Sequence, residues 1–244
     1  MSTIFAAMSK YRDQKTRSWQ MFNEIALRYD ILNRLLSFGL HLNWRRDMAR
    51  YLPEKDRLSI LDLATGTADV LLALFSVSSL VESGVGLDLA EKMLEIGRRK
   101  IEQKGLSEKI VLQHSDAAEI PFVENHFDCT TIAFGIRNMP DPQKVLAEMF
   151  RVLKPGGRAL ILEFSMPANP VLRALHLIYL KNIIPIIGFL FSGHYKAYRY
   201  LNRTIEEFPY GAAFEAWMKG AGFKNVLSHP VTFGVANIYQ GDKT

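Results

Sequence analysis

Three apolar segments, each running into a small or acidic residue, constrain this chain more than any other feature. The first, 60–63, leads into the small-residue turn 64–67, the second closes at Asp88, and Asp116 follows the third, 110–114. The carboxyl ends of neighbouring parallel strands meet at one edge of an α/β sheet, where nucleotides bind. We therefore predict a nucleoside site at that edge.

Each part of this pattern suits one part of a nucleoside. A turn of small residues lets the backbone approach a ligand, Asp88 can accept hydrogen bonds from both ribose hydroxyls, and Asp116 with Ala117 can contact the base. A single strand-end acid would be ordinary in any α/β protein. Two such acids, spaced from the turn by one βα unit each, favour a nucleoside site over that structural interpretation.

The composition of the turn limits which nucleoside it can hold. Its only glycine, Gly66, does not make the Gly-x-Gly-x-x-Gly pattern of dinucleotide-binding enzymes, and the turn lacks the Gly-Lys-Ser/Thr ending of a phosphate-binding P-loop. A nucleoside carrier without a pyrophosphate remains, and S-adenosylmethionine is such a carrier.

The surrounding sequence alternates strands and helices, which predicts a single α/β domain, 1–244, built on a parallel, doubly wound sheet. Strands are expected at 59–63, 84–88, 110–114, 128–134 and 158–164, and helices at 68–78, 90–104, 142–153 and 210–220. The Lys-Pro-Gly-Gly turn at 154–157 is expected to end the third of these helices. Two later runs, 223–228 and 233–240, are expected to close the sheet as an antiparallel pair.

Two segments fall outside this alternation. Apolar residues recur at helical spacing from Trp19 to Tyr51, with an interruption at Gly39, which predicts two or three helices in an amino-terminal cover, 1–57. The segment 165–205 is broken into helical pieces by prolines, and we expect it to form a lid or a substrate-binding insertion.

The charge of this second segment is uneven. Residues 164–205 include no acid but five Lys/Arg among long apolar runs, a combination that suits the surface of an anionic bilayer. Basic residues divide the segment and Pro185 interrupts its longest apolar run, so we expect no transmembrane helix. The basic residues alternate with aliphatic side chains, which favours a membrane or an apolar substrate over nucleic acid. Candidate contacts for lipid phosphates are Arg173, Lys181, Lys196 and Arg199.

Several chemistries lack the residues they need. Cys129 is the only cysteine and lies in an apolar run, so an internal disulfide is excluded and a small buried thiol is favoured over a nucleophile. The six histidines are scattered and Asp141 stands alone after the fourth strand, so we expect no metal site. Residues 1–17 lack the apolar core of a signal peptide, and we expect a cytoplasmic protein.

Three signatures resemble those of a known family. The run Phe-x-x-Ile-Ala-x-x-Tyr-Asp-x-x-Asn-x-x-x-Ser-x-Gly at 22–39, with a Trp-Arg pair behind it, is similar to the amino-terminal signature of the menaquinone/ubiquinone C-methyltransferases. Phe-Gly-Ile-Arg-Asn at 134–138 resembles their second signature, and 151–165 resembles their third. The resemblance extends over residues 19 to 243, and the first two signatures together are specific.

This resemblance implies a class I S-adenosylmethionine-dependent methyltransferase with a Rossmann-like sheet of seven strands, the last of them antiparallel. Matched position by position, it assigns S-adenosylmethionine to Thr67, Asp88, Asp116 and Ala117, with Asp62 and Gly66 at the methionine end. The match departs from the family at two places. Ala133 stands where many members have a serine that contacts the cofactor, and the turn has Thr65 and Ala68 at positions where glycine is frequent.

The acceptor that the resemblance implies is a reduced polyprenyl quinone, methylated on a ring carbon. Such a carbon is a poor nucleophile until a ring hydroxyl releases electron density into it, so the enzyme must stabilise phenolate character. We assign this task to Arg137 and Asn138, place Tyr29 or Asp30 of the cover near the substrate, and expect 170–191 to take the prenyl tail. The competing structural roles are a surface salt bridge for Arg137, and helix packing and capping for Tyr29 and Asp30.

Several alternatives remain open at this point. Ala133 and the Thr-Ala-Asp ending of the turn favour a naphthoquinol acceptor, demethylmenaquinol, over the benzoquinol of the ubiquinone pathway. Another lipid-like acceptor, such as a sterol or a fatty acyl chain, would require the same cofactor residues, whereas a cofactor-free adaptor of a quinone-synthesis complex would not. A nucleic-acid methyltransferase is disfavoured because no Asn-Pro-Pro-Tyr-type loop follows the fourth strand. We also expect peripheral contact with the inner face of a membrane, and the oligomeric state is left open.

Overall fold

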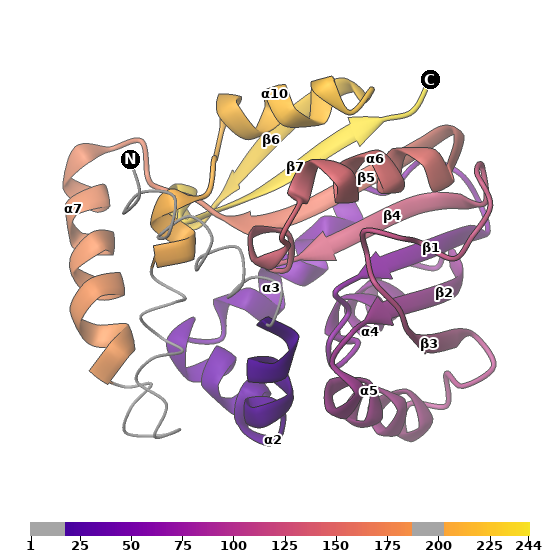
Figure 1. Cartoon of the computed structure of the whole chain (residues 1–244), viewed down its shortest axis with the longest axis horizontal. Helices are drawn as coiled ribbons and strands as arrows, with labels where there is room; N and C mark the ends of the chain where they lie inside the picture. The colour runs from indigo at the N-terminus through magenta and orange to yellow at the C-terminus, as the bar shows by residue number, and fades with distance from the viewer. Residues whose placement is uncertain (1–17, 187–202) are drawn as a thin grey trace, which may run out of the picture.

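The computed structural model describes residues 18–186 and 203–244, which form a seven-stranded sheet with helices on both faces (Figure 1). The strands lie in the order β3-β2-β1-β4-β5-β7-β6. Their bounds are β1 Leu58–Leu63, β2 Val81–Asp88, β3 Ile110–His114, β4 Phe127–Ala133, β5 Leu153–Phe164, β6 Lys224–Val231 and β7 Ala236–Asp242. β7 runs antiparallel to both β5 and β6, and the other pairs are parallel. The predicted α/β class and the antiparallel closing pair are confirmed.

The order of the strands reverses between β1 and β4. From β1 the chain proceeds to β2 and β3 on one side, and it then crosses to β4 and β5 on the other. In open α/β sheets, ligands bind outside the carboxyl ends of the strands at this point of reversal. We therefore expect a ligand site at the loops that follow β1 and β4.

Two hydrophobic layers cover the sheet because alternate strand residues point to opposite faces. The central helices are α4 Asp69–Val77, α5 Glu91–Gln103, α6 Pro142–Val152 and α10 Ala212–Gly220. Leu61 and Leu63 of β1 pack in a core with residues of α6 and α10. Leu58 and Ile60 of the same strand pack in a second core with residues of α4 and α5. This arrangement confirms the doubly wound packing that the sequence predicts.

The described part of the predicted amino-terminal cover is helical and includes α2 Ser18–Leu36, α3 Leu40–Asp47 and the 3-10 turn η1 Met48–Tyr51, while residues 1–17 of the predicted cover lie outside the described residues. Gly39, with φ 77°, lies between α2 and α3 in the left-handed region that glycine adopts at low cost. Trp44 Nε1 donates to Thr232 Oγ1 at 2.8 Å, which ties α3 to the turn before β7. Figure 1 shows α2, in indigo, beyond the ends of the central parallel strands.

The insertion after β5 is helical where the structure describes it. It comprises α7 Pro170–Ile178, the π-helical turn η3 Tyr179–Ile183 and helical residues up to 186, while 187–202 of the predicted insertion lie outside the described residues. Asn169 Oδ1 caps α7 by accepting from the backbone N–H groups of Val171 and Leu172. Within 18–186 and 203–244, no helix is long and apolar enough to cross a membrane.

The largest error in the predicted strand boundaries is at the start of β5. The Lys-Pro-Gly-Gly segment was expected to separate the helix from a strand that begins at residue 158, but β5 begins at Leu153, directly after α6. Phe127 pairs with Leu153 and Cys129 pairs with Arg158, so residues 154–157 form a bulge within the strand. Gly156, with φ 78°, donates its N–H to the Lys243 carbonyl. The turn-like composition of residues 154–157 therefore belongs to a bulge within a strand rather than to a loop.

Candidate active site

The turn after β1 has an unusual backbone conformation. Ala64, Gly66 and Ala68 all have positive φ values, of 48°, 55° and 63°. Gly66 N donates to Asp88 Oδ2 at 2.8 Å, and Ala90 N donates to Asp88 Oδ1 at the same distance. Asp88 thus links the turn after β1 to the start of α5. Burial raises the pKa of Asp88, and the two backbone amides oppose that shift.

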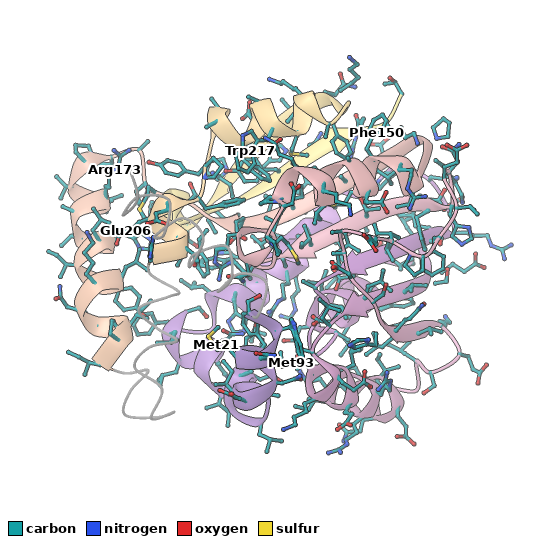
Figure 2. All side chains as sticks on the ribbon, in the orientation of Figure 1. Met21, Met93, Phe150, Arg173, Glu206 and Trp217 are labelled. Carbon is teal, nitrogen blue, oxygen red and sulfur yellow. The ribbon has the colours of Figure 1, made fainter. Side chains whose placement is uncertain are left out.

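A cavity of about 140 Å³, here called the turn cavity, opens beside this turn. It is lined by most of the residues to which the sequence assigns the cofactor: Gly66, Asp88, Asp116 and Ala117. Asp116 is exposed and accepts from Ala118 N, whereas Ala117 is buried. Met93 of α5, labelled in Figure 2, completes the wall where α5 meets α2.

Three other predicted residues lie behind the turn rather than in the cavity lining that the described residues form. Thr67 Oγ1 donates to Asp30 Oδ1 at 3.0 Å and accepts from Lys100 Nζ at 2.8 Å. Lys100 also pairs with Asp30 and with Asp69, so Thr67 and Asp30 belong to an ionic cluster that joins α2, α4 and α5. Asp62 is fully buried and accepts from Thr131 Oγ1 at 2.6 Å.

A second cavity, of about 260 Å³, lies under the amino-terminal cover and is here called the cover cavity. It shares Phe22, Tyr29, Phe134 and Asn138 with the turn cavity, so the two adjoin along one wall. Most of its lining is apolar, including Leu180 and Ile184 of the insertion. Met21 of α2, labelled in Figure 2, also lines it.

Cationic side chains gather on the polar part of the cover cavity. Arg137 Nη1 lies 2.6 Å from Glu163 Oε1 and 2.7 Å from the Phe134 carbonyl, and its guanidinium stands 5.0 Å from the ring centroid of Phe164. Arg45 Nη1 pairs with Asp69 Oδ2 at 3.1 Å. The Nε atoms of both arginines are buried and have no hydrogen-bond partner among the described residues. These two N–H groups are therefore buried polar groups without a partner among the described residues.

The predicted catalytic pair lies at this place. Arg137 and Asn138 are both buried, in the short turn η2 Ile136–Asn138 after β4, and Asn138 Nδ2 donates to the Phe134 carbonyl at 3.3 Å. The alternative of a surface salt bridge for Arg137 was wrong, because its ion pair with Glu163 is itself buried. Tyr29 lines both cavities, and burial raises its pKa, so its hydroxyl stays protonated.

Glu163, which pairs with Arg137, and Arg45 and His41, which line the cover cavity, were not singled out in the sequence. Glu163 had a signal, since it is an acid within the apolar strand 158–164, and such a residue needs a buried partner. Arg45 belongs to the Trp-Arg pair of the first signature, yet its place beside the cavity depends on how α3 crosses the sheet. His41 had no spacing that marks it as functional.

Comparison with known proteins decides the family. The profile of the ubiE/COQ5 methyltransferase family matches residues 8–243 of this chain. The chain belongs to this family. As a member of the ubiE/COQ5 family it is an S-adenosylmethionine-dependent C-methyltransferase, and the predicted resemblance is confirmed.

The relatives of this ubiE/COQ5 family member match over nearly their whole length. A ubiquinone/menaquinone biosynthesis C-methyltransferase UbiE of Geotalea daltonii is 42% identical over 236 residues, which cover 97% of this chain and 100% of that protein. A demethylmenaquinone methyltransferase of Thermus thermophilus is 47% identical over 223 residues, covering 91% and 100%. A demethylmenaquinone methyltransferase of Bacteroides fragilis is 40% identical over 225 residues, covering 92% and 91%.

Solved structures agree on the fold of this family member. A putative S-adenosyl-L-methionine-dependent methyltransferase from Methanococcus maripaludis superposes with a TM-score of 0.64 at 18% identity, over 91% of this chain and 93% of that one. A Thermotoga maritima protein described as an S-adenosylmethionine-dependent methyltransferase gives 0.63 at 17% identity, over 93% and 99%. The class I methyltransferase fold is thereby confirmed.

Proposed function

We propose that this protein transfers the methyl group of S-adenosylmethionine to a ring carbon of a reduced polyprenyl quinone, with demethylmenaquinol as the acceptor. The observation that carries the proposal is the pair of adjoining cavities. One has the strand-end acids of a nucleoside site, and the other is apolar with an arginine-rich end. The names of the relatives support the same reaction.

The residues of the turn cavity fit the cofactor. The positive φ of Gly66 brings backbone to the cavity wall, Asp88 offers a carboxylate at the end of β2, and Ala117 gives a small buried surface beside Asp116. When bound, S-adenosylmethionine supplies an electrophilic methyl group on a sulfonium. Asp88 would hold the ribose, and Asp116 and Ala117 would hold the adenine.

The cover cavity suits the acceptor. The quinol ring would lie between Tyr29 and Asn138, which line both cavities, and this position would bring its ring carbon toward the methyl donor. Arg137 would stabilise phenolate character on the ring hydroxyl, because the buried pairing with Glu163 fixes its guanidinium in place. Leu180 and Ile184 would contact the first units of the prenyl tail.

The naphthoquinol is the proposed acceptor, and the benzoquinol of the ubiquinone pathway is the second candidate. The Thermus thermophilus and Bacteroides fragilis relatives are named for demethylmenaquinone, whereas the Geotalea daltonii relative is named for both pathways. Mass spectrometry of the quinone pool in cells that lack this protein separates the two. Accumulation of demethylmenaquinone alone supports the proposal, and accumulation of the benzoquinone precursor supports the second candidate.

We also propose that the insertion touches the inner face of the membrane from the cytoplasm. Large apolar side chains are exposed on α7, namely Val171 at 66%, Leu175 at 59% and Ile178 at 54%, and after η3 at Ile186, at 59%. Arg173, labelled in Figure 2, and Lys181 flank these side chains, although Lys181 pairs with Glu206. Lys196 and Arg199 lie outside the described residues. An amphipathic helix of this kind favours the interface of an anionic bilayer.

A further inference from the structure

His41 is a buried titratable side chain that the reaction described above does not use. It lies in the first turn of α3, is 5% exposed, and lines the cover cavity together with Tyr29, Arg45 and Arg137. Tyr29 and Arg137, which line the same cavity, are among the groups to which we assign the ring of the quinol. What the two ring nitrogens of His41 can do in this cavity depends on which of them is protonated.

Ser37 determines which nitrogen of His41 has the proton. Ser37 Oγ donates its only proton to the Asn33 carbonyl at 2.7 Å, and the same oxygen lies 2.5 Å from His41 Nδ1. A hydroxyl whose proton is already donated can only accept, so Nδ1 carries the proton and donates to Ser37. His41 Nε2 then has a free lone pair and no protein partner among the described residues.

The surroundings keep this imidazole neutral. Burial, together with the charges of Arg45, Arg34 and Lys100, lowers the pKa of His41 to about 4, and Asp69 opposes this shift. At neutral pH the ring is therefore neutral rather than a cation, and its Nε2 lone pair is available to a ligand. The same cationic side chains favour negative charge on a ligand beside the ring.

The other titratable side chains that we place at this end of the cavity, Tyr29, Arg45 and Arg137, donate. Burial raises the pKa of Tyr29, so its hydroxyl stays protonated, and Arg45 and Arg137 have only N–H groups to offer. No Asp or Glu is among the described residues that line the cover cavity. Among the described lining residues, the histidines are therefore the candidate bases for the quinol hydroxyl.

His176 is the other histidine in the cavity lining, and its environment differs. It lies on α7, on the side of Leu180 and Ile184, and burial alone lowers its pKa, with no contribution from a charged side chain. Without a neighbouring cation, a phenolate formed beside it would be unstabilised. The matched control for His41 is His229 of β6, a half-buried histidine that lines neither cavity and whose Nε2 lies 3.1 Å from Gln240 Oε1.

We propose that His41 is a catalytic residue, whose Nε2 accepts the proton of the ring hydroxyl as the methyl group is transferred. This inference rests on the proposed function. The O–H bond breaks as the N–H bond forms, and the oxygen electron pair moves into the ring. The ring carbon then forms a bond to the methyl carbon while the sulfur–methyl pair returns to sulfur. Loss of the ring C–H proton to water restores the aromatic ring, and the imidazolium returns its proton to the oxygen. The net products are the methylated quinol, the neutral thioether and one proton in solution.

The test compares His41→Gln with His229→Gln, assayed with a short-tailed demethylnaphthoquinol kept reduced. We expect kcat to fall by about 10²-fold or more for His41→Gln and by less than about threefold for His229→Gln. S-adenosylmethionine affinity, measured by calorimetry, should be unchanged in both variants. Equal rates for His41→Gln and the wild type would overturn the inference, and wild-type protein that methylates no quinol would overturn the proposed function instead.

A second measurement separates chemistry from packing. In His41→Gly, added imidazole should restore activity in proportion to its concentration, because it can occupy the vacated place and accept the proton. The apparent pKa of a bound 1-naphthol, followed by its absorbance, should be higher in His41→Gln than in the wild type. Absence of rescue together with an unchanged naphthol pKa would show that His41 only packs, and the inference would fail.

Discussion

Arg137 and Glu163 form a buried ion pair, with 2.6 Å between Nη1 and Oε1 and side-chain exposures of 5% and 1%. The pair joins the turn after β4 to the end of β5, across 26 residues of sequence. Burial raises the pKa of Glu163, and the charge of Arg137 opposes that shift. The position of the guanidinium in the cover cavity therefore depends on one carboxylate in the adjacent strand.

Replacing Glu163 with Leu should destabilise the protein by about 3–5 kcal/mol, because it leaves the buried Arg137 without its partner. Chemical denaturation followed by circular dichroism measures this loss. The double variant Arg137→Met/Glu163→Leu is the matched control and should be more stable than Glu163→Leu alone. A cost below about 1 kcal/mol for the single variant would contradict the account of a buried, mutually dependent pair.

Asp88→Asn should weaken the binding of S-adenosylmethionine by about tenfold or more, which corresponds to 1.5–3 kcal/mol for a lost charged acceptor. The amide keeps one oxygen to accept from the Gly66 N–H and loses the acceptor of the Ala90 N–H. Isothermal calorimetry gives the affinity, and Glu119→Gln, on the exposed Lys144 pair, is the control. Unchanged affinity for Asp88→Asn would place the cofactor elsewhere.

The buried Asp62 should make the free energy of unfolding fall as pH rises. Burial raises its pKa to about 7 from an ordinary value of 3.8, while the Thr131 hydroxyl opposes the shift. Below the pKa that Asp62 has in the unfolded chain, its carboxyl is protonated in both the folded and the unfolded state, and its contribution to stability is fully present. Between the unfolded and the folded pKa, the Asp62 carboxyl of the folded chain keeps a proton that the unfolded chain has released. The contribution of Asp62 to stability is therefore lost as pH rises through its folded pKa.

Asp62→Asn should therefore differ from the wild type in its pH dependence. The unfolding free energy of the wild type, relative to that of the variant, should fall by roughly 1.4 kcal/mol per pH unit in the window between the two pKa values. Urea denaturation at several pH values between 4.5 and 7.5 measures the difference. Parallel curves for the two proteins would show that Asp62 has no raised pKa.

The exposed face of α7 should bind anionic vesicles. Replacing Leu175 and Ile178 with Ser should lower co-sedimentation with phosphatidylglycerol vesicles several-fold, because each side chain is more than half exposed. Val123→Ser, an exposed apolar side chain in the loop before β4, is the control. If both proteins sediment like the wild type, α7 does not contact the membrane.

The strand-end positions of the site could be predicted from sequence because topology determines them. Gly66, Asp88, Asp116 and Ala117 each follow a parallel strand, and the carboxyl edge of the sheet brings such residues together whatever the side chains are. Thr67 and Asp62 were assigned to the cofactor and Asp30 to the substrate, but the three side chains make contacts behind the turn. The direction of the Thr67 side chain depends on the positive φ values of its neighbours Gly66 and Ala68, which spacing does not reveal.

The cover cavity was harder to predict because its polar groups come from distant segments. Arg45 and His41 reach it through the crossing of α3, which Trp44 fastens to Thr232 from 188 residues away. No local pattern encodes that contact. Similarly, the bulge at 154–157 has the composition of a loop, and only pairing with β4 makes it part of a strand.

The central claim is methylation of a quinol ring carbon, and one measurement tests it most directly. Purified protein is incubated with S-adenosylmethionine that carries a trideuterated methyl group and with demethylmenaquinol kept reduced by dithionite, and the product is analysed by mass spectrometry and proton NMR. The account predicts a trideuteromethyl group on the ring carbon and loss of the ring proton signal. A product labelled on oxygen, or no labelled quinol while the protein binds S-adenosylmethionine, would contradict it.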